Sequence, residues 1–245
     1  EYVYINEVAD ADGNPLGQVH KFEVDTGGSL TEVAGANGIP WYPGAGGTSE
    51  LPSPHGLGVD RNGFLYIGSN FNTPNVIRRL DCQGNIKPTS EYVAPPGGAN
   101  FGTGLFNIHS HDGNIYATGS FERIYKHDPC TGDRLGYIVL NSGSGDWGFH
   151  IDENGTFYST DMNGKIYVYT PTAADFVANT AYDAVIDLGA NPTLVSPAYA
   201  GEGLQGITTD DSGNIYVVEG SRDVNGTPSR LLKFDASFAF LGAGP

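Results

Sequence analysis

Residues 210–220 read DDSGNIYVVEG, a polar turn followed by an apolar strand. The chain contains four copies of this pattern. In each copy a glycine is followed, three positions later, by a tyrosine. The copies are DRNGFLYIGS from Asp60, SHDGNIYATG from Ser110, DENGTFYSTD from Asp152 and DDSGNIYVVE from Asp210. Glycine supplies the positive φ of a tight hairpin turn, and Asn or Asp beside it tolerates that turn. Because the flanking runs are β-branched or aromatic, the repeated unit is a β-hairpin.

Each repeat extends beyond one hairpin. A strand rich in small residues precedes the turn, as in PHGLGVD from Pro54, and two more strands follow, as in SRLLKFD from Ser229 and FAFLGAG from Phe238. Four antiparallel strands per repeat are typical of a β-propeller blade. The first strand is innermost, and crowding around the axis explains the glycines that it carries in three of the repeats: Gly56, Gly58, Gly148 and Gly206. One short helical turn is expected in the segment that begins at Pro171.

The N-terminal segment adds a partial repeat. VYINE from Val3 aligns with IYVVE from Ile215, which places the first strand of the chain second in its blade. We therefore predict an all-β propeller of about five blades in a single domain, with the first blade lacking its innermost strand. A sixth blade is the alternative, although the segment from Pro171 to Gly203 shows no Gly–Tyr hairpin. The predicted blades cover residues 1–40, 51–95, 101–140, 145–190 and 201–245.

The composition restricts the possible partners. Twelve Lys and Arg stand against 28 Asp and Glu, for a net charge of −16, so the surface repels nucleic acid. No run reaches the ~18 apolar residues of a membrane span. Low lysine and a start inside a strand, without Met, favour an extracellular or cell-surface protein whose signal segment has been removed.

The repeats SPHGLGVDRNGFLYIGS and LQGITTDDSGNIYVVEG resemble those of NHL-repeat propellers and of their gluconolactonase-like and virginiamycin B lyase-like relatives. The resemblance runs through nearly the whole chain. It implies the fold, while propellers as a class have unrelated functions. Enzymes of this kind hold a divalent ion near the axis with acidic and Asn side chains, and this set is matched here only in part.

Two rings of side chains are expected around the central channel. At the start of the innermost strands, His55, Trp147 and Gln205 are candidate binding residues, but His55 has no partner for acid–base or metal chemistry, so no catalytic set is assigned. At the ends of the second strands, Glu7, Asp161 and Glu219 fall in consecutive blades. Converging carboxylates suit Ca²⁺, whereas solvated acids on an acidic protein are the simpler interpretation.

Cys82 and Cys130 occupy matching turns of successive repeats. A disulfide fits an extracellular chain, but bridged Cα atoms must approach within ~7 Å, and matching turns of neighbouring blades can lie farther apart. Both possibilities stay open, while zinc is disfavoured because there is no second pair.

Three functions follow from these observations. The first is a non-enzymatic structural or interaction role, in which self-association through the termini or by strand addition builds filaments or a surface lattice. The second is a metal-dependent lactonase-like hydrolase or lyase. The third is a carbohydrate- or peptide-binding module.

Overall fold

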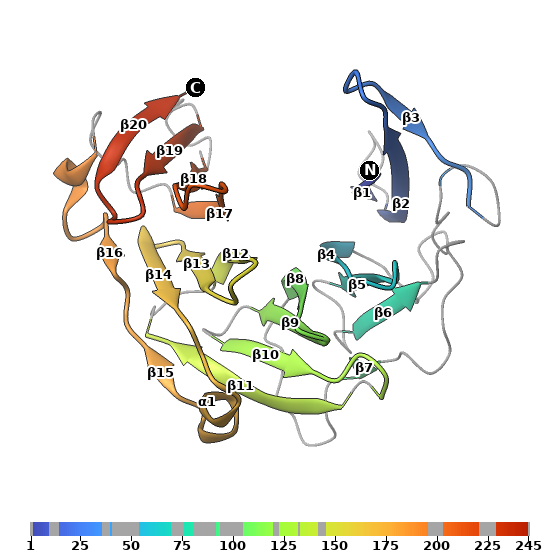
Figure 1. Cartoon of the computed structure of the whole chain (residues 1–245), viewed down its shortest axis with the longest axis horizontal. Helices are drawn as coiled ribbons and strands as arrows, with labels where there is room; N and C mark the ends of the chain where they lie inside the picture. Colours follow the sequence, from blue (N-terminus) through green and yellow to red (C-terminus); the bar gives the residue numbers. More distant parts are fainter. Residues whose placement is uncertain are drawn as a thin grey trace. The chain divides into compact units, whose positions relative to one another are not determined.

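A computed structural model describes most of the chain. It covers residues 2–9, 15–35, 40, 54–69, 76–80, 92–93, 105–119, 123–131, 133–141, 146–195, 203–220 and 229–244. The described residues form five sheets of three to five strands and one short α-helix (Figure 1). The fold is a five-blade β-propeller in which each sheet is one blade, as predicted from the repeats. No helix among the described residues has the length and apolar character needed to cross a bilayer.

The chain divides into two compact units. The first contains residues 1–117 and 128–133, and the second contains residues 118–127 and 134–245. The two are described separately below, and the prediction of a single domain stays a prediction.

The first unit holds the first two blades. The first blade has the strand order β1-β2-β3, the second has the order β4-β5-β6-β7, and the pairing in both is antiparallel. The strands β8 and most of β9 from the third blade also belong to this unit. The bounds are β1 Tyr2–Ala9, β2 Pro15–Val24, β3 Leu30–Glu32, β4 Pro54–Val59, β5 Leu65–Ser69, β6 Val76–Leu80, β7 Tyr92–Val93, β8 Leu105–His111 and β9 Asn114–Gly119.

The second unit holds the outer strands of the third blade and all of the last two. The third blade has the order β15-β11-β10-β9-β8, the fourth β12-β13-β14-β16 and the fifth β17-β18-β19-β20. The bounds are β10 Arg123–His127, β11 Arg134–Leu140, β12 Asp146–Ile151, β13 Phe157–Asp161, β14 Lys165–Tyr169, β15 Ala181–Tyr182, β16 Ile186–Asp187, β17 Leu204–Thr209, β18 Ile215–Glu219, β19 Arg230–Phe234 and β20 Phe240–Gly244.

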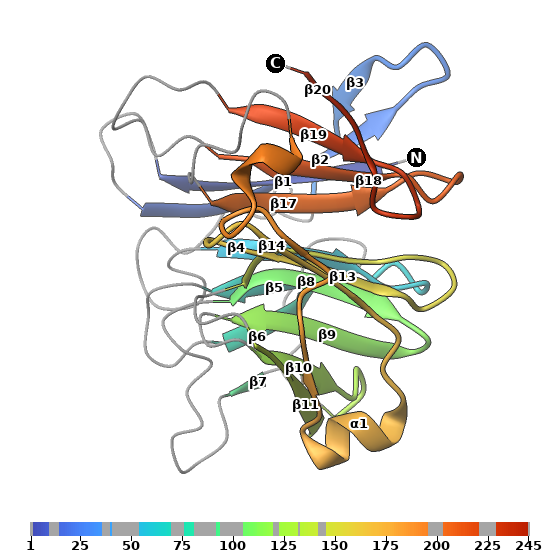
Figure 2. The same cartoon turned by 90° about the vertical axis from the view of Figure 1, so that its left-hand side faces the viewer.

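The fourth blade contains an excursion between its third and fourth strands. After β14 the chain forms the helix α1 (Ala173–Ala178), adds β15 in parallel to β11, and returns as β16. The helix packs on β11 (Figure 2). The backbone of Phe176 comes so close to Gly136 in β11 that a Cβ at this position would overlap it. The short helix that the sequence predicts in this segment is thus confirmed.

Among the described residues the first blade lacks an innermost strand, as predicted. Its strand β1 contacts β4, the innermost strand of the second blade, in the way that β5 contacts β8. The strand β5 is second in its blade, so β1 also occupies the second position. No strand pairs with the other edge of β1 among the described residues.

An aspartate organises most of the repeated hairpins. Asp60 Oδ1 accepts hydrogen bonds from the backbone N–H groups of Asn62 (2.8 Å) and Phe64 (3.0 Å), and Oδ2 accepts one from the Tyr66 hydroxyl (3.1 Å). We call this arrangement the Asp–Tyr turn. Its further copies are Asp152 with Tyr158, Asp161 with Tyr167, and Asp210 with Tyr216. It satisfies two turn N–H groups and gives the tyrosine hydroxyl a hydrogen-bond partner.

The third repeat uses a different turn. Its aspartate is displaced to Asp112, and both Asp112 (φ 46°) and Gly113 (φ 69°) lie in the left-handed region. Two consecutive residues with positive φ define a two-residue hairpin whose twist matches that of the flanking strands. This turn joins β8 to β9 in the third repeat.

Glycines allow the innermost strands to approach one another closely. A Cβ on Gly58 of β4 would lie 2.7 Å from the Ile108 carbonyl oxygen of β8, which is backbone and cannot move aside. In the second unit, a Cβ on Gly148 would lie 3.0 Å from the Cα atom of Gly206. Crowding of the inner strands, inferred from the sequence, is therefore the physical reason for Gly58 and Gly148. It does not explain Gly206, where an added Cβ would make only ordinary contacts.

Each unit has its own hydrophobic core. In the first unit Val19, Leu65, Ile67 and Leu80 form a fully buried cluster, against which Tyr4 packs. In the second unit the core joins the fourth and fifth blades and is larger. Its members are Tyr158, Ile166, Ile186, Leu188, Val195, Leu204, Ile207, Ile215, Val217, Leu232 and Phe234.

The close approach of β4 and β8 leads to a stability prediction. Gly58→Ala should destabilise the protein by about 1–3 kcal/mol, because the added methyl group must displace the backbone of β8. The matched control is Gly206→Ala, where the nearest atom to a Cβ is 3.6 Å away. Urea unfolding of both variants measures the effect. Equal stabilities would contradict this account of the inner-strand glycines.

Candidate functional site

The structure places the three channel-face candidates on innermost strands, as expected. His55 lies in β4, and its side chain is outside the described residues. Trp147 in β12 is half-buried, and Gln205 in β17 is exposed. The Gln205 side chain packs so closely over Gly220 that a Cβ on this glycine would overlap it. The binding role of these residues stays a prediction.

The predicted metal ligands Asp161 and Glu219 already have protein partners. Asp161 is buried, and its Oδ1 accepts hydrogen bonds from the N–H groups of Asn163 (2.9 Å) and Lys165 (2.8 Å) in an Asp–Tyr turn. Burial raises the pKa of Asp161, and these two hydrogen bonds oppose the increase. The carboxylate of Glu219, also buried, pairs with Arg230 at 2.5 Å from Nε to Oε2.

The third predicted ligand, Glu7, lies in β1 with its side chain outside the described residues. Within the described part of the chain, no three His, Cys, Asp or Glu side chains gather as a metal-binding group. Calcium binding by Glu7, Asp161 and Glu219 stays a prediction, and protein contacts account for two of the three carboxylates.

Calcium binding can be tested by calorimetry. A site occupied by Ca²⁺ would raise the thermal midpoint, because a ligand that binds only the folded state stabilises it. The midpoint is measured in EDTA and in excess Ca²⁺, for the parent and for Glu219→Gln. A Ca²⁺-dependent rise that the variant lacks would support the site, and equal midpoints in the parent would rule it out.

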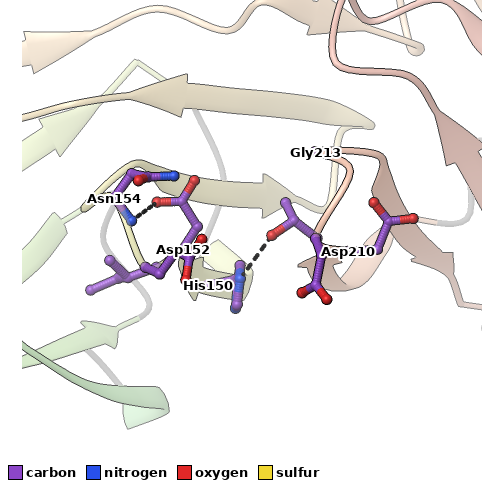
Figure 3. Close-up of a pocket in the computed structure, with 9 residues that line it drawn as sticks. His150, Asp152, Asn154, Asp210 and Gly213 are labelled. Atoms are coloured by element: carbon purple, nitrogen blue, oxygen red, sulfur yellow. Dashed lines mark hydrogen bonds between the residues drawn. The ribbon is translucent and has the colours of Figure 1, made fainter.

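A hollow of about 250 Å³ lies in the second unit, at the other ends of the innermost strands (Figure 3). It forms where β12 and β17 run into their Asp–Tyr turns. The residues predicted from the sequence lie at the starts of these strands, so the hollow at their ends was not predicted. The available signal was the polar residue near the end of each strand, just before the turn aspartate. The lining residues are His150, Ile151, Asp152, Glu153, Asn154, Thr209, Asp210, Asp211 and Gly213.

His150 and Thr209 connect the two sides of the hollow. The His150 Nε2 atom lies 3.2 Å from Thr209 Oγ1, and its ring centroid lies 6.0 Å from that of Tyr158. Burial lowers the pKa of His150, and the negative charge of Asp152 partly opposes this effect. The imidazole is therefore mostly neutral at pH 7.

The carboxylates at the hollow have two different roles. Asp152 and Asp210 are engaged in their turns, and hydrogen bonds, chiefly from the Asn214 side chain, lower the pKa of Asp210 to about 2. Glu153 and Asp211 are exposed at the rim. Four carboxylates around one polar hollow produce a negative potential that favours positively charged groups over anions.

Comparisons with known proteins support the fold. No family model matches the chain, and no curated protein matches it. Solved structures do match: a chain of the mitotic checkpoint complex (TM-score 0.60, 11% identity), the WD40 β-propeller domain of Doa1 (0.53, 11%) and a putative gluconolactonase (0.56, 10%). In the same order, the matches cover 100%, 93% and 91% of this chain. They span 60%, 61% and 69% of the length of the three known structures.

These similarities define the class of protein, a β-propeller whose structural neighbours include WD40 and gluconolactonase-like members. At such identities they show the fold alone. Lactonase-like activity and carbohydrate or peptide binding therefore stay predictions.

The Asp210 turn leads to a prediction on acid stability. Its folded-state pKa of about 2 lies below the ordinary value of 3.8. The ionised carboxylate thus contributes stability that is fully present above about pH 4 and is lost as the pH falls through 2. Asn214→Ala should raise the pKa of Asp210 towards 3.8 and make the loss of stability between pH 4 and pH 2 shallower.

NMR titration of the Asp210 carboxyl and unfolding at several pH values measure this effect. Ser212→Ala is the matched control, because Ser212 donates to Asp210 through its backbone N–H. An unchanged pKa in Asn214→Ala would contradict the assigned cause.

Proposed function

We propose that this protein is a non-enzymatic interaction module that assembles with copies of itself by strand addition at its first blade. The single observation that carries the proposal is the place of β1. It is second in its blade, and no strand pairs with its other edge among the described residues.

The β1 strand has few of the features that protect a sheet edge. Proteins usually block such edges with Lys, Pro, bulges or short strands. The β1 strand has eight residues, YVYINEVA, without Lys, Arg or Pro, and its one irregularity in register lies near its end, between Glu7 and Ala9. Tyr2, Val3 and Ile5 are 51%, 39% and 47% exposed. An added strand would pair with the backbone groups along this edge and lie beside these apolar side chains.

The occupant that the chain itself offers is β20 of a second copy. This strand, FLGAG, ends the fifth sheet, and Leu241 on it is 54% exposed. Its glycines and alanine suit the crowded innermost position, where other blades have glycine. It carries no charge, so its addition brings no further negative charge to β1 of a chain whose net charge is −16.

The resulting contact would be head-to-tail, because donor and acceptor are different surfaces. Such contacts produce filaments or lattices unless they close into a ring. We propose an extracellular or cell-surface location for the assembly, in keeping with the composition. Protein is therefore the partner that this function requires.

Light scattering and electron microscopy of three variants test the proposal. Ile5→Lys in β1 and Leu241→Lys in β20 should each block growth, because each places a charge in the proposed contact. Leu30→Lys, at the opposite edge of the first sheet and also 54% exposed, is the control and should assemble like the parent.

Mixing the two blocking variants provides the sharper test. The Ile5→Lys copy keeps an intact β20 and the Leu241→Lys copy an intact β1, so an equimolar mixture should contain a heterodimer that cannot grow. A parent that stays monomeric at all concentrations overturns the proposal. Assembly that neither variant disturbs overturns the choice of edges.

A further inference from the structure

The outer edge of β11 in the third blade is covered by a segment that comes from the fourth blade. Between β14 and β16 the chain forms α1 and adds β15 in parallel to β11 (Figure 2). We call residues 172–183 the guard. The N–H of Val139 donates to the carbonyl oxygen of Thr180 at 2.9 Å. The N–H of Asn141 donates to that of Tyr182, also at 2.9 Å.

Phe176 anchors the guard to both blades. Its side chain is 2% exposed, and its ring centroid lies 6.2 Å from that of Phe157 in β13. The Nζ atom of Lys126 in β10 lies 5.4 Å from the same centroid. The backbone of Phe176 lies against Gly136 of β11. The next residue, Val177, is 75% exposed and takes no part in this packing.

The guard has little stability of its own. The helix α1 has six residues, fewer than the ~12–15 that an isolated helix needs in water. The strand β15 has two residues, and Tyr182 in it stacks on Tyr169 with 4.7 Å between the ring centroids. Because both elements depend on docking, we expect the guard to dock and to detach as one unit.

Without the guard, β11 would be an open sheet edge. Residues 137–141 read YIVLN, without charge or Pro, and the one irregularity of register in β11 lies nearer its start. Backbone groups of alternate residues face the same edge, so Tyr137 faces the guard together with Val139 and Asn141. An antiparallel pair of two β11 strands centred on Val139 sets Tyr137 of each copy opposite Asn141 of the other. No like charges meet in this pair, although each chain has a net charge of −16.

We propose that the guard is a releasable cover of a second association edge. When docked, it closes the outer edge of β11, and when detached, it opens that edge to β11 of a second copy. This contact joins identical surfaces, so it closes as a dimer, whereas the contact proposed for β1 is head-to-tail. The inference rests on residues of the second unit alone and holds whether or not β1 adds a strand.

Light scattering of guard variants tests the proposal. All copies carry Ile5→Lys, which blocks the β1 edge, so only the β11 edge is measured. Phe176→Ala should detach the guard and give a particle of twice the monomer mass. Val177→Ala, at the exposed neighbouring position, is the matched control and should stay monomeric. Val139→Pro added to Phe176→Ala should restore the monomer, because proline is tolerated at an edge but removes an N–H that faces it.

Hydrogen exchange shows whether the guard has detached. The N–H of Thr180, which donates to the carbonyl oxygen of Asp175 at 3.0 Å, should exchange about a hundredfold faster in Phe176→Ala than in Val177→Ala. Amides of β17 and β18 should keep their protection, which shows that the blades stay folded. If they lose it, Asp175→Ala is the second variant. It removes the Oδ2 acceptor of the Thr172 N–H (2.7 Å) at the start of α1 without opening a cavity.

The outcomes that overturn the proposal are distinct. A monomer whose Thr180 amide exchanges faster would show that the open edge does not pair. Unchanged exchange would show that the guard does not depend on Phe176. A dimer that persists with Val139→Pro would place the contact elsewhere. Reducing conditions keep the exposed Cys130 from linking copies. Cys82 lies outside the described residues, so its disulfide with Cys130 stays a prediction.

Discussion

The Asp–Tyr turn is the interaction on which the repeated hairpins of this protein depend. A hairpin turn leaves N–H groups without strand partners, and a tyrosine beneath it brings a hydroxyl into an apolar layer. One carboxylate solves both problems, as Asp60 does for Asn62, Phe64 and Tyr66. Because the acceptor is charged, these hydrogen bonds are stronger than neutral ones, and the hairpin register is fixed locally. Local fixing of this kind allows similar hairpins to recur within one chain.

The same interaction occupies several of the acidic residues that the sequence suggests as binding groups. Asp152 and Asp210 lie beside a polar hollow and Asp161 lies at a predicted metal position, yet each is held by its own turn. Glu219 is neutralised by Arg230. The carboxylates that lie at the rim of the hollow without a place in a turn are Glu153 and Asp211, and both are exposed.

Two features of the fold depart from strict repetition, and both concern sheet edges. The excursion through α1 and β15 covers the outer edge of the third blade by parallel pairing with β11. The first blade does the opposite, because β1 stands second with no innermost strand paired to it among the described residues. A propeller blade depends on its innermost strand to cover the second one. In β1 the side chain of Ile5 is 47% exposed, whereas Leu65 and Ile67 in β5 are fully buried.

The sequence by itself determined the hairpin repeat, the number of blades and the order of the four strands that each repeat contributes, because glycine turns and alternating apolar residues act within a few positions of each other. It also placed the first described strand second in its blade. The addition of β15 to the third blade was decided by the tertiary structure. Only the tertiary structure decided which side chains meet across strands and blades: the Tyr hydroxyl six residues from its aspartate, the meeting of His150 with Thr209, and the reach of Arg79 to Pro129. The last of these joins residues 50 positions apart, and such pairings depend on how sheets pack rather than on any local pattern. The ends of the innermost strands are the clearest case, because their polar residues become one hollow only when two blades lie side by side.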